Sequence, residues 1–260
     1  MSFAASASLL AGGLFIGMLL LYEVGRRIGL VRLAHDPGGV TNGSGPVEAA
    51  IFGLLGLLLA FTFSGAASRF EERRHLVAEE TNAIGTAYLR VDLLSPDGQP
   101  ALRQLFSRYL DARLETFRSL ADVAATQANL SATDALQHQI WTRALSASQQ
   151  PGAAPDAQKL LLPALNQMFD ITTTRTMATH NHPPTIIFHL LAGLSLLSAL
   201  LIGYVMCNTV KRSWFYVLLV SAAMSTTFYV ILDLEYPRLG LIRVDAADQV
   251  LMDLRKSMGQ

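Results

Sequence analysis

Two charged segments of the chain have the residue types and spacing for ion chemistry. The segment 69–80 carries eight titratable side chains in twelve residues, and the segment 233–244 follows the last apolar stretch. Spacings of three and four residues place charged groups on shared helix faces. We expect ion pairs between the segments, in which Arg69 or Arg73 pairs with Asp233 or Glu235. These form either a structural clasp or a vestibule that concentrates ions. The clasp candidates are Glu79, Glu80, Asp233, Glu235, Arg238 and Arg243.

Four histidines are weaker candidates for chemistry. His180 and His182 are two residues apart, and His75 or Glu79 is a conceivable neighbour, but two histidines without an assigned third ligand do not define a metal site. A capped helix end before Pro183 and Pro184 is the better explanation of this pair. His189 lies inside an apolar stretch, where an ionisable group is either proton-linked or an ordinary hydrated side chain near the surface. We therefore predict no metal ligands.

Enzyme motifs are absent from the sequence. It has no G-x-S-x-G elbow, no H-E-x-x-H zinc motif and no Walker loop, and no nucleophile has a neighbouring base. The polar run Thr172–Arg175 matches no known motif. We expect neither catalysis nor a cofactor.

Four apolar stretches must position these residues. Each is about long enough to cross a bilayer core of roughly 30 Å as a helix. Among Asp, Glu, Lys, Arg and His, only His189 lies inside any of them. The stretches are Ala5–Tyr22, Ala49–Ala67, Thr185–Cys207 and Ser213–Leu232. The sequence therefore predicts a protein that resides in the lipid bilayer.

Composition agrees with a membrane protein. Of 260 residues, 51% are hydrophobic and 15% are charged, the formal net charge is zero and the mean hydropathy is +0.35. Nothing indicates a nucleic-acid partner. The single cysteine, Cys207, excludes an intrachain disulfide. Met1–Ala7 lacks Lys and Arg, and no A-x-A-like site follows, so we expect the first stretch to be retained rather than cleaved.

The order of the stretches predicts a domain organisation. Residues 1–67 form a first transmembrane pair with its loop, 68–184 a stalk and soluble helical insert, 185–232 a second pair, and 233–260 a tail on the insert side. The flexible loop 35–46 connects the first pair. Basic residues of the short loops, such as Arg26 and Lys211, favour cytoplasmic loops and an external insert. Arg69, Arg74 and Arg238 flank the membrane exits on the insert side and favour the reverse.

Hydrophobic periodicity predicts an all-α fold. The second apolar stretch continues without proline as a helical stalk through 69–94, which a turn at 95–98 ends. Amphipathic helices follow over Pro100–Thr126, from Ser131 as N-cap to about Ser146, and over Asp156–Thr179. No strand pattern is visible.

The second apolar stretch has one helical face of small residues. Such a row lets two membrane helices approach closely. This approach is either self-packing of several subunits around an axis or packing against the other helices of one subunit. The row contains Gly53, Gly56, Ala60, Ser64 and Ala67.

A second face of the same stretch has the pattern of a gated pore. It has Glu48 at one mouth, apolar residues in the middle, and Arg69 and Arg73 at the other mouth. In a ring of subunits this face forms a hydrophobic constriction that gates by dewetting. In a single subunit the same pattern describes a face against lipid or core. The predicted lining residues are Phe52, Leu55, Leu59, Thr62 and Ala66.

Three motifs resemble the bacterial bestrophin-like family. They are 53–64 (GLLGLLLAFTFS), 66–94, which contains AASRFEERR and EETNAIGTAYLRVDLL, and 232–244 (LDLEYPRLGLIRV). The common closing pattern has Asp where this chain has Glu235, and Arg-Pro where it has Tyr236-Pro237. The family is named for a distant similarity to bestrophins, pentameric chloride channels whose second helix lines a neck.

The resemblance implies a homo-oligomeric multi-pass protein of the bacterial inner membrane. We expect an ion channel, with anions favoured, whose second transmembrane helix lines the pore. The implied partners are further copies of the chain, as a pentamer by analogy, the lipid bilayer and small inorganic ions. The alternative function is a non-conducting scaffold or sensor that acts through its helical insert. A proton-driven stator-like assembly ranks last, because the spans contain no acidic residue.

Overall fold

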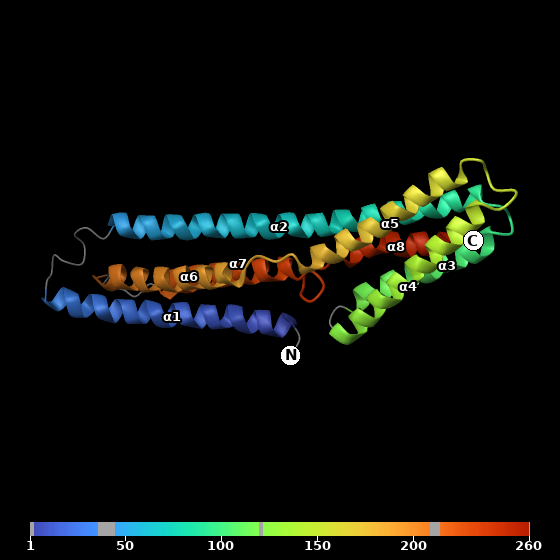
Figure 1. The fold of residues 1–260 in the computed structure, drawn as a ribbon. Helices are drawn as coiled ribbons and strands as arrows, with labels where there is room; N and C mark the ends of the chain where they lie inside the picture. Colours follow the sequence, from blue (N-terminus) through green and yellow to red (C-terminus); the bar gives the residue numbers. More distant parts are fainter. Residues whose placement is uncertain (1–2, 36–44, 120–121, 209–213, 260) are drawn as a thin grey trace. The chain divides into compact units, whose positions relative to one another are not determined.

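The computed structural model describes residues 3–35, 45–119, 122–208 and 214–259, with the side chains of 208, 245 and 246 excepted. Most of the loop expected at 35–46 and the basic pair Lys211–Arg212 lie outside these ranges. Every regular element within them is helical, which confirms the all-α prediction (Figure 1). The elements are α1 (Phe3–His35), α2 (Gly45–Leu89), η1 (Arg90–Leu93), α3 (Gln99–Arg118), α4 (Val123–Ser148), α5 (Ala157–His180), α6 (Thr185–Val205), η2 (Met206–Asn208), α7 (Trp214–Glu235) and α8 (Asp245–Ser257).

The helices form two compact units. The first, here called the membrane unit, contains residues 1–70 and 182–242, and the second, the helical unit, contains 71–181 and 243–260. Helix α2 contributes to both, because the division falls after Phe70. Its 45 residues form one α-helix, as the absence of proline after the apolar stretch predicts.

Four stretches of helix are long and apolar enough to cross a membrane. They are Phe3–His35, Gly45–Leu93, Ala157–Val205 and Trp214–Glu235. This confirms the four apolar helices. Their arrangement as two pairs around the insert stays a prediction.

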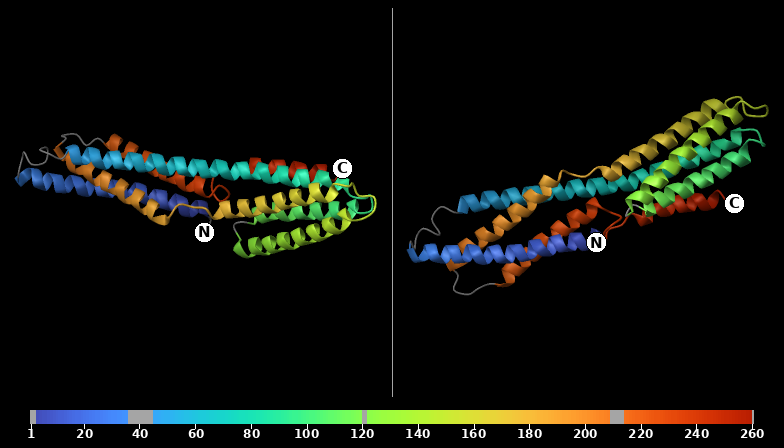
Figure 2. Two further views of the ribbon diagram at one scale, coloured as in Figure 1. Left: turned by 45° about the horizontal axis from the view of Figure 1, so that its top comes forward. Right: turned by 60° about the horizontal axis from the view of Figure 1, so that its bottom comes forward.

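In the membrane unit, α1 packs along α6 and α7 (Figure 2). Gly25 of α1 and Gly203 of α6 allow the closest approach. A Cβ atom on Gly25 would overlap the carbonyl of Leu200, and one on Gly203 would overlap the carbonyl of Tyr22. Small residues at helix contacts are how membrane helices gain close packing.

The core of the membrane unit joins α2 to the other three long helices. Leu55 and Ala66 of α2 belong to the same buried cluster as Met18, Leu191 and Phe228. Helix α2 thus has one side that packs inside its own subunit.

The helical unit packs α3, α4, α5 and α8 with the last part of α2. Phe106, Leu110, Ile140, Leu165 and Leu251 are fully buried in its core. The apolar positions of α3 recur every three or four residues, as the sequence predicts, and they form its buried face.

Two helix boundaries in this unit differ from the prediction. Helix α3 ends at Arg118 rather than near Thr126, and α4 begins at Val123 rather than at Ser131. The Asp122 side chain accepts hydrogen bonds from the Ala124 and Ala125 amides at 3.0 and 3.1 Å, so it supplies the cap expected of Ser131. Helix α5 matches its predicted range within one residue, and α8 was not predicted.

Candidate functional site

The predicted pore helix has two unlike faces in the membrane unit. One, here called the bundle face, consists of Leu55, Leu59, Thr62 and Ala66. Leu55 is 1% exposed and Ala66 is fully buried, while Leu59 and Thr62 are half-buried. The Thr62 hydroxyl donates to the Leu58 carbonyl at 2.7 Å. The bundle face therefore packs against its own subunit and satisfies its own polar group.

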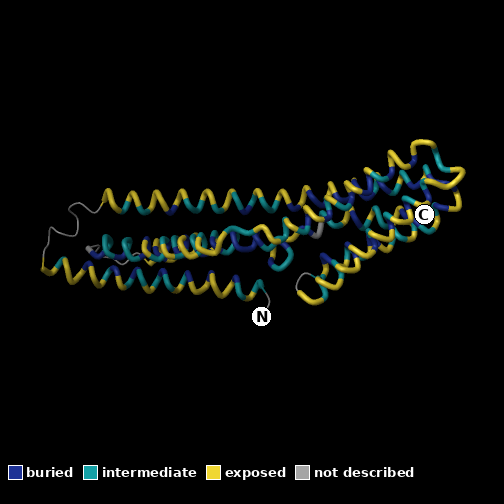
Figure 3. The backbone as a smooth tube through the Cα atoms, in the orientation of Figure 1, coloured by how far each residue is buried: buried dark blue, intermediate teal, exposed yellow. Residues whose placement is uncertain are grey.

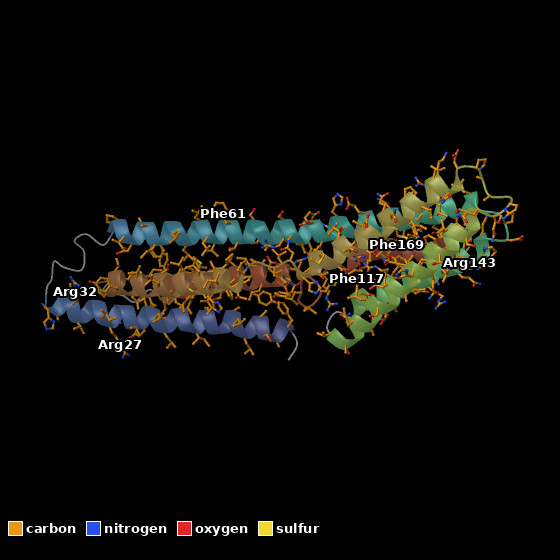
Figure 4. All side chains as sticks on the ribbon, viewed as in Figure 1. Arg27, Arg32, Phe61, Phe117, Arg143 and Phe169 are labelled. Carbon is orange, nitrogen blue, oxygen red and sulfur yellow. The ribbon has the colours of Figure 1, made fainter. Side chains whose placement is uncertain are left out.

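The other face, here called the open face, consists of Gly53, Gly56, Ala60 and Ser64. All four residues are exposed. Exposed backbone recurs along one side of α2 (Figure 3). A Cβ atom added to either glycine would meet none of the described residues within 4 Å. Large side chains flank this row and are exposed too, among them Phe61, which points away from the bundle (Figure 4). Nothing in the described part of the subunit covers the small-residue row.

The other predicted pore residues have mixed surroundings. Phe52 is 36% exposed and lies beside the open face. Glu48 at the start of α2 is half-buried, and its Oε1 atom has no hydrogen-bond partner among the described residues. Leu55 and Ala66 could reach a pore only if α2 turned about its axis.

Both arginines of the predicted pore mouth bond to their own chain. Arg69 pairs with Glu235 within the membrane unit. Arg73 belongs to the helical unit, where it donates to the Ala178 carbonyl at 3.1 Å and the Asn181 carbonyl at 2.9 Å. These carbonyls lie at the end of α5, where helices leave acceptors unsatisfied. Both guanidinium groups are therefore bonded within their own chain.

Glu235 is the centre of a charged cluster in the membrane unit, here called the clasp. Its side chain is fully buried at the end of α7. Arg69 Nε donates to Glu235 Oε1 at 3.0 Å, and His182 Nδ1 lies 3.5 Å from Oε2. The His182 ring stacks on Tyr236 with centroids 4.4 Å apart. The clasp joins α2, the residues before α6, and the end of α7.

Asp233, two residues earlier, has a structural role. Its carboxylate accepts hydrogen bonds from the Leu241 amide at 3.0 Å and the Ile242 amide at 2.8 Å. Gly240 lies so close that a Cβ atom there would overlap this carboxylate. The spacing of Asp233 and Gly240 in the closing motif therefore holds a tight turn after α7.

The remaining clasp candidates are divided between the two units. Glu79 and Glu80 belong to the helical unit, where Glu79 is exposed and 3.5 Å from His75. Arg238 is half-buried and Arg243 is exposed. His180 is also exposed, and its ring faces the Thr176 carbonyl. Among the described residues, no group of three His, Cys, Asp or Glu side chains is placed to hold a metal ion.

A second buried charge cluster lies inside the helical unit. Glu80 of α2 bonds to Arg113 of α3 and Arg175 of α5, and all three side chains are almost completely buried. Arg175 also pairs with Asp248 of α8 at 3.1 Å. Both guanidinium groups lie over the Phe117 ring, 4.8 and 3.5 Å from its centroid. The Glu80 carboxylate therefore joins three helices, and Arg175 links α8 to them through Asp248.

The electrostatics of this cluster favour its charged form. Burial alone would raise the pKa of Glu80, but Arg113 and Arg175 outweigh it and hold that pKa below the ordinary value. Burial would lower the pKa of Arg113, but the Glu80 carboxylate raises it instead. For Arg175 burial dominates and the pKa is lowered. Glu80 stays ionised at neutral pH.

Arg113 and Arg175 were missed in the sequence, although a signal existed. Arg113 continues the apolar series Phe106, Leu110 and Phe117, and Arg175 continues Leu165 and Met168 in the same way. A charged residue at a core position of an amphipathic helix is expected to have a buried partner. His182 gave no such signal, because its partner Glu235 is distant in sequence.

Comparison with known proteins agrees with this architecture. A sequence model of the Bestrophin-like domain matches residues 9–248. Two crystal structures of mutants of a bacterial Bestrophin homolog from Klebsiella pneumoniae share the fold, with TM-scores of 0.69 and 0.64 at 16% and 15% identity. Each match covers 95% of this chain, and 99% and 97% of the respective crystallised chain. A search of curated proteins found no match.

Proposed function

The chain belongs to the Bestrophin-like family, and from this premise we propose that it forms a homo-oligomeric ion channel whose α2 helices surround a common pore. Four apolar helices and the shared fold support a membrane protein of this class. The bacterial inner membrane is the proposed location. Five copies per channel is the number that the similarity to bestrophins implies.

One observation carries the proposal most directly: the open face of α2 has no cover in the described subunit. Lipid chains contact large apolar side chains well, but they fill a row of Gly53, Gly56 and Ala60 poorly. Small rows of this kind are typical of contacts between membrane helices. Copies of α2 arranged around an axis would turn this face toward the axis and away from the lipid.

Two faces of α2 are candidates for the pore lining. The bundle face and Phe52 have the apolar centre expected of a dewetting gate. Leu55 and Ala66, however, are buried in their own subunit, whereas Ala60 and Ser64 are already exposed. We propose the open face as the lining of the state described here. Lining by the bundle face would require α2 to rotate.

Anions are the first ions to test, because the family resemblance implies them. We expect only a weak preference for anions over cations. Arg69 and Arg73 keep their positive charges, but Glu235 neutralises the first, and carbonyl groups of α5 hold the second inside the helical unit.

The proposal is tested with purified protein in liposomes, by measuring the release of chloride and of potassium. Ala60→Trp adds a large ring to the open face, and Ala222→Trp adds the same ring to an exposed alanine of α7. We expect wild-type protein and the α7 variant to conduct, and Ala60→Trp to reduce flux at least about tenfold. Wild-type protein that releases neither ion would refute the channel.

A further inference from the structure

Three segments that are distant in sequence meet at the buried carboxylate of Glu235. Arg69 comes from α2, His182 from the residues just before α6, and Glu235 ends α7. Arg69 Nε donates to both carboxylate oxygens, at 3.0 Å to Oε1 and 3.2 Å to Oε2. His182 Nδ1 lies 3.5 Å from Oε2.

The histidine contact is incomplete. His182 Nδ1 is buried and has no hydrogen-bond partner among the described residues. The ring as a whole is 26% exposed, so water can deliver a proton to it. Protonation puts a hydrogen on both ring nitrogens and a positive charge beside the carboxylate. A charge-assisted hydrogen bond to Oε2 would then complete the clasp.

We propose that His182 is a proton sensor that tightens the Glu235 clasp when the surrounding solution becomes acidic. Histidine is the side chain whose charge ordinarily changes between about pH 5 and 8. Arg69 stays charged throughout that range. The sensor therefore adds a second cation to an existing ion pair rather than replacing the first.

The surroundings of His182 are compatible with this role. Among the described residues, the groups around it include Glu235 from α7, Arg69 from α2 through the shared carboxylate, and the Tyr236 ring after α7. Phe3 of α1, which carries no charge, packs on the Tyr236 ring, with the two ring centroids 4.5 Å apart. The stack holds the imidazole beside the carboxylate in either protonation state.

The regulatory consequence rests on the proposed function. Arg69 is part of the proposed pore helix, so a tighter clasp restrains the end of the membrane part of α2 against α7. A restrained helix is less able to move during gating, so we expect ion flux to fall as pH decreases from 7.5 to 5.5.

The sensor is tested first by thermal unfolding, which requires no conductance. Wild type, His182→Gln and the control His180→Gln are melted in one detergent at pH 5.5, 6.5 and 7.5. In the proposal, a protonated His182 adds a charge-assisted hydrogen bond to the clasp, so this added stabilisation is present at low pH and is lost as pH rises. We expect acidification to raise the melting temperature of wild type and of the control by about 2–4 °C relative to His182→Gln.

A second variant separates sensing from folding. Glu235→Gln removes the charge that attracts the imidazolium, and its melting temperature should change with pH as that of His182→Gln does. If both variants keep the wild-type pH response, the sensor is refuted. If the response disappears in His180→Gln as well, it does not belong to His182, and the proposal also fails.

Flux measurements complete the test. With wild-type protein in liposomes, we expect chloride or potassium release to be at least about threefold slower at pH 5.5 than at 7.5, and this ratio to approach one in His182→Gln. An unchanged ratio in the variant would overturn the regulatory role. Absence of flux at every pH would refute the proposed channel instead, and the melting experiment would still decide whether the clasp senses protons.

Discussion

The two sides of α2 carry similar residues in opposite environments. In the membrane unit, Ala66 is fully buried while Ser64, two residues earlier, is exposed. In the helical unit, Glu80 is fully buried and bonded to two arginines, while Glu79 is exposed. Residue type alone therefore does not reveal the role of a position on this helix. The packed side maintains each unit, and the exposed side is available to partners or ions.

The largest contrast is expected between the adjacent glutamates. Glu80→Ala leaves two buried guanidinium groups without their carboxylate, and removal of one member of a buried ion pair costs about 3–5 kcal/mol. Glu79→Ala removes an exposed partner of His75 and should change the free energy of unfolding by less than about 0.5 kcal/mol. Chemical denaturation of both variants measures the difference. Equal effects would show that the Glu80 cluster contributes no special stability.

Adjacent arginines provide the next contrast. Arg73→Ala removes charged hydrogen bonds to the Ala178 and Asn181 carbonyls, which should cost about 1.5–3 kcal/mol. Arg74→Ala breaks only an exposed pair with Glu71 and should cost less than about 0.5 kcal/mol. Denaturation curves of the two variants test this order. A larger loss for Arg74→Ala would contradict the inward placement of Arg73.

Bulky substitutions compare the two faces in the membrane unit. Ala66→Trp inserts a ring into a filled core, and overpacking of this kind costs about 1–3 kcal/mol. Ser64→Trp adds the same ring to the open face and should leave the melting temperature of the dissociated subunit unchanged. Size-exclusion chromatography should instead show a weakened oligomer for Ser64→Trp. Destabilisation of the subunit by Ser64→Trp would mean that this face is packed.

The smallest difference is expected between the Glu80 and Glu79 variants when their stability is compared at acid pH. Because the folded state lowers the pKa of Glu80, its stabilising contribution is complete above the ordinary value of 4.5 and is lost as pH falls through the lowered value. Glu80→Gln should remove this part of the acid sensitivity, and Glu79→Gln should retain it. Melting temperatures between pH 7 and 3 report the difference. The same acid sensitivity in both variants would contradict the charged state of Glu80.

The sequence allowed more of the helices to be predicted than of the contacts between them. Apolar length identified the four candidate spans, and period-3.6 patterning identified the amphipathic face of α3. Helix α8 was missed because its short amphipathic pattern, Asp245–Ser257, follows a turn with no strong cap. The start of α4 was misplaced because Asp122, rather than Ser131, caps it.

The sites depend on long-range packing that a local pattern does not contain. Both faces of α2 are visible in its sequence, but whether Leu55 or Gly53 turns inward depends on α6 and α7, more than a hundred residues away. The partners of Glu80 are comparably remote. Arg113 and Arg175 could have been suspected from their core positions, but only the folded unit shows that they share one carboxylate.

Cysteine accessibility during ion flux tests the proposed pore most directly. The native background is favourable, because the single cysteine, Cys207, is buried. Single cysteines at Ala60 and Ser64 are compared with single cysteines at Leu55 and Thr62, using a charged thiol reagent on conducting liposomes. We predict that the reagent reduces flux through Ala60→Cys and Ser64→Cys and leaves the other two unchanged. Block at Leu55→Cys and Thr62→Cys, with none at Ala60→Cys and Ser64→Cys, would contradict a pore lined by the open face.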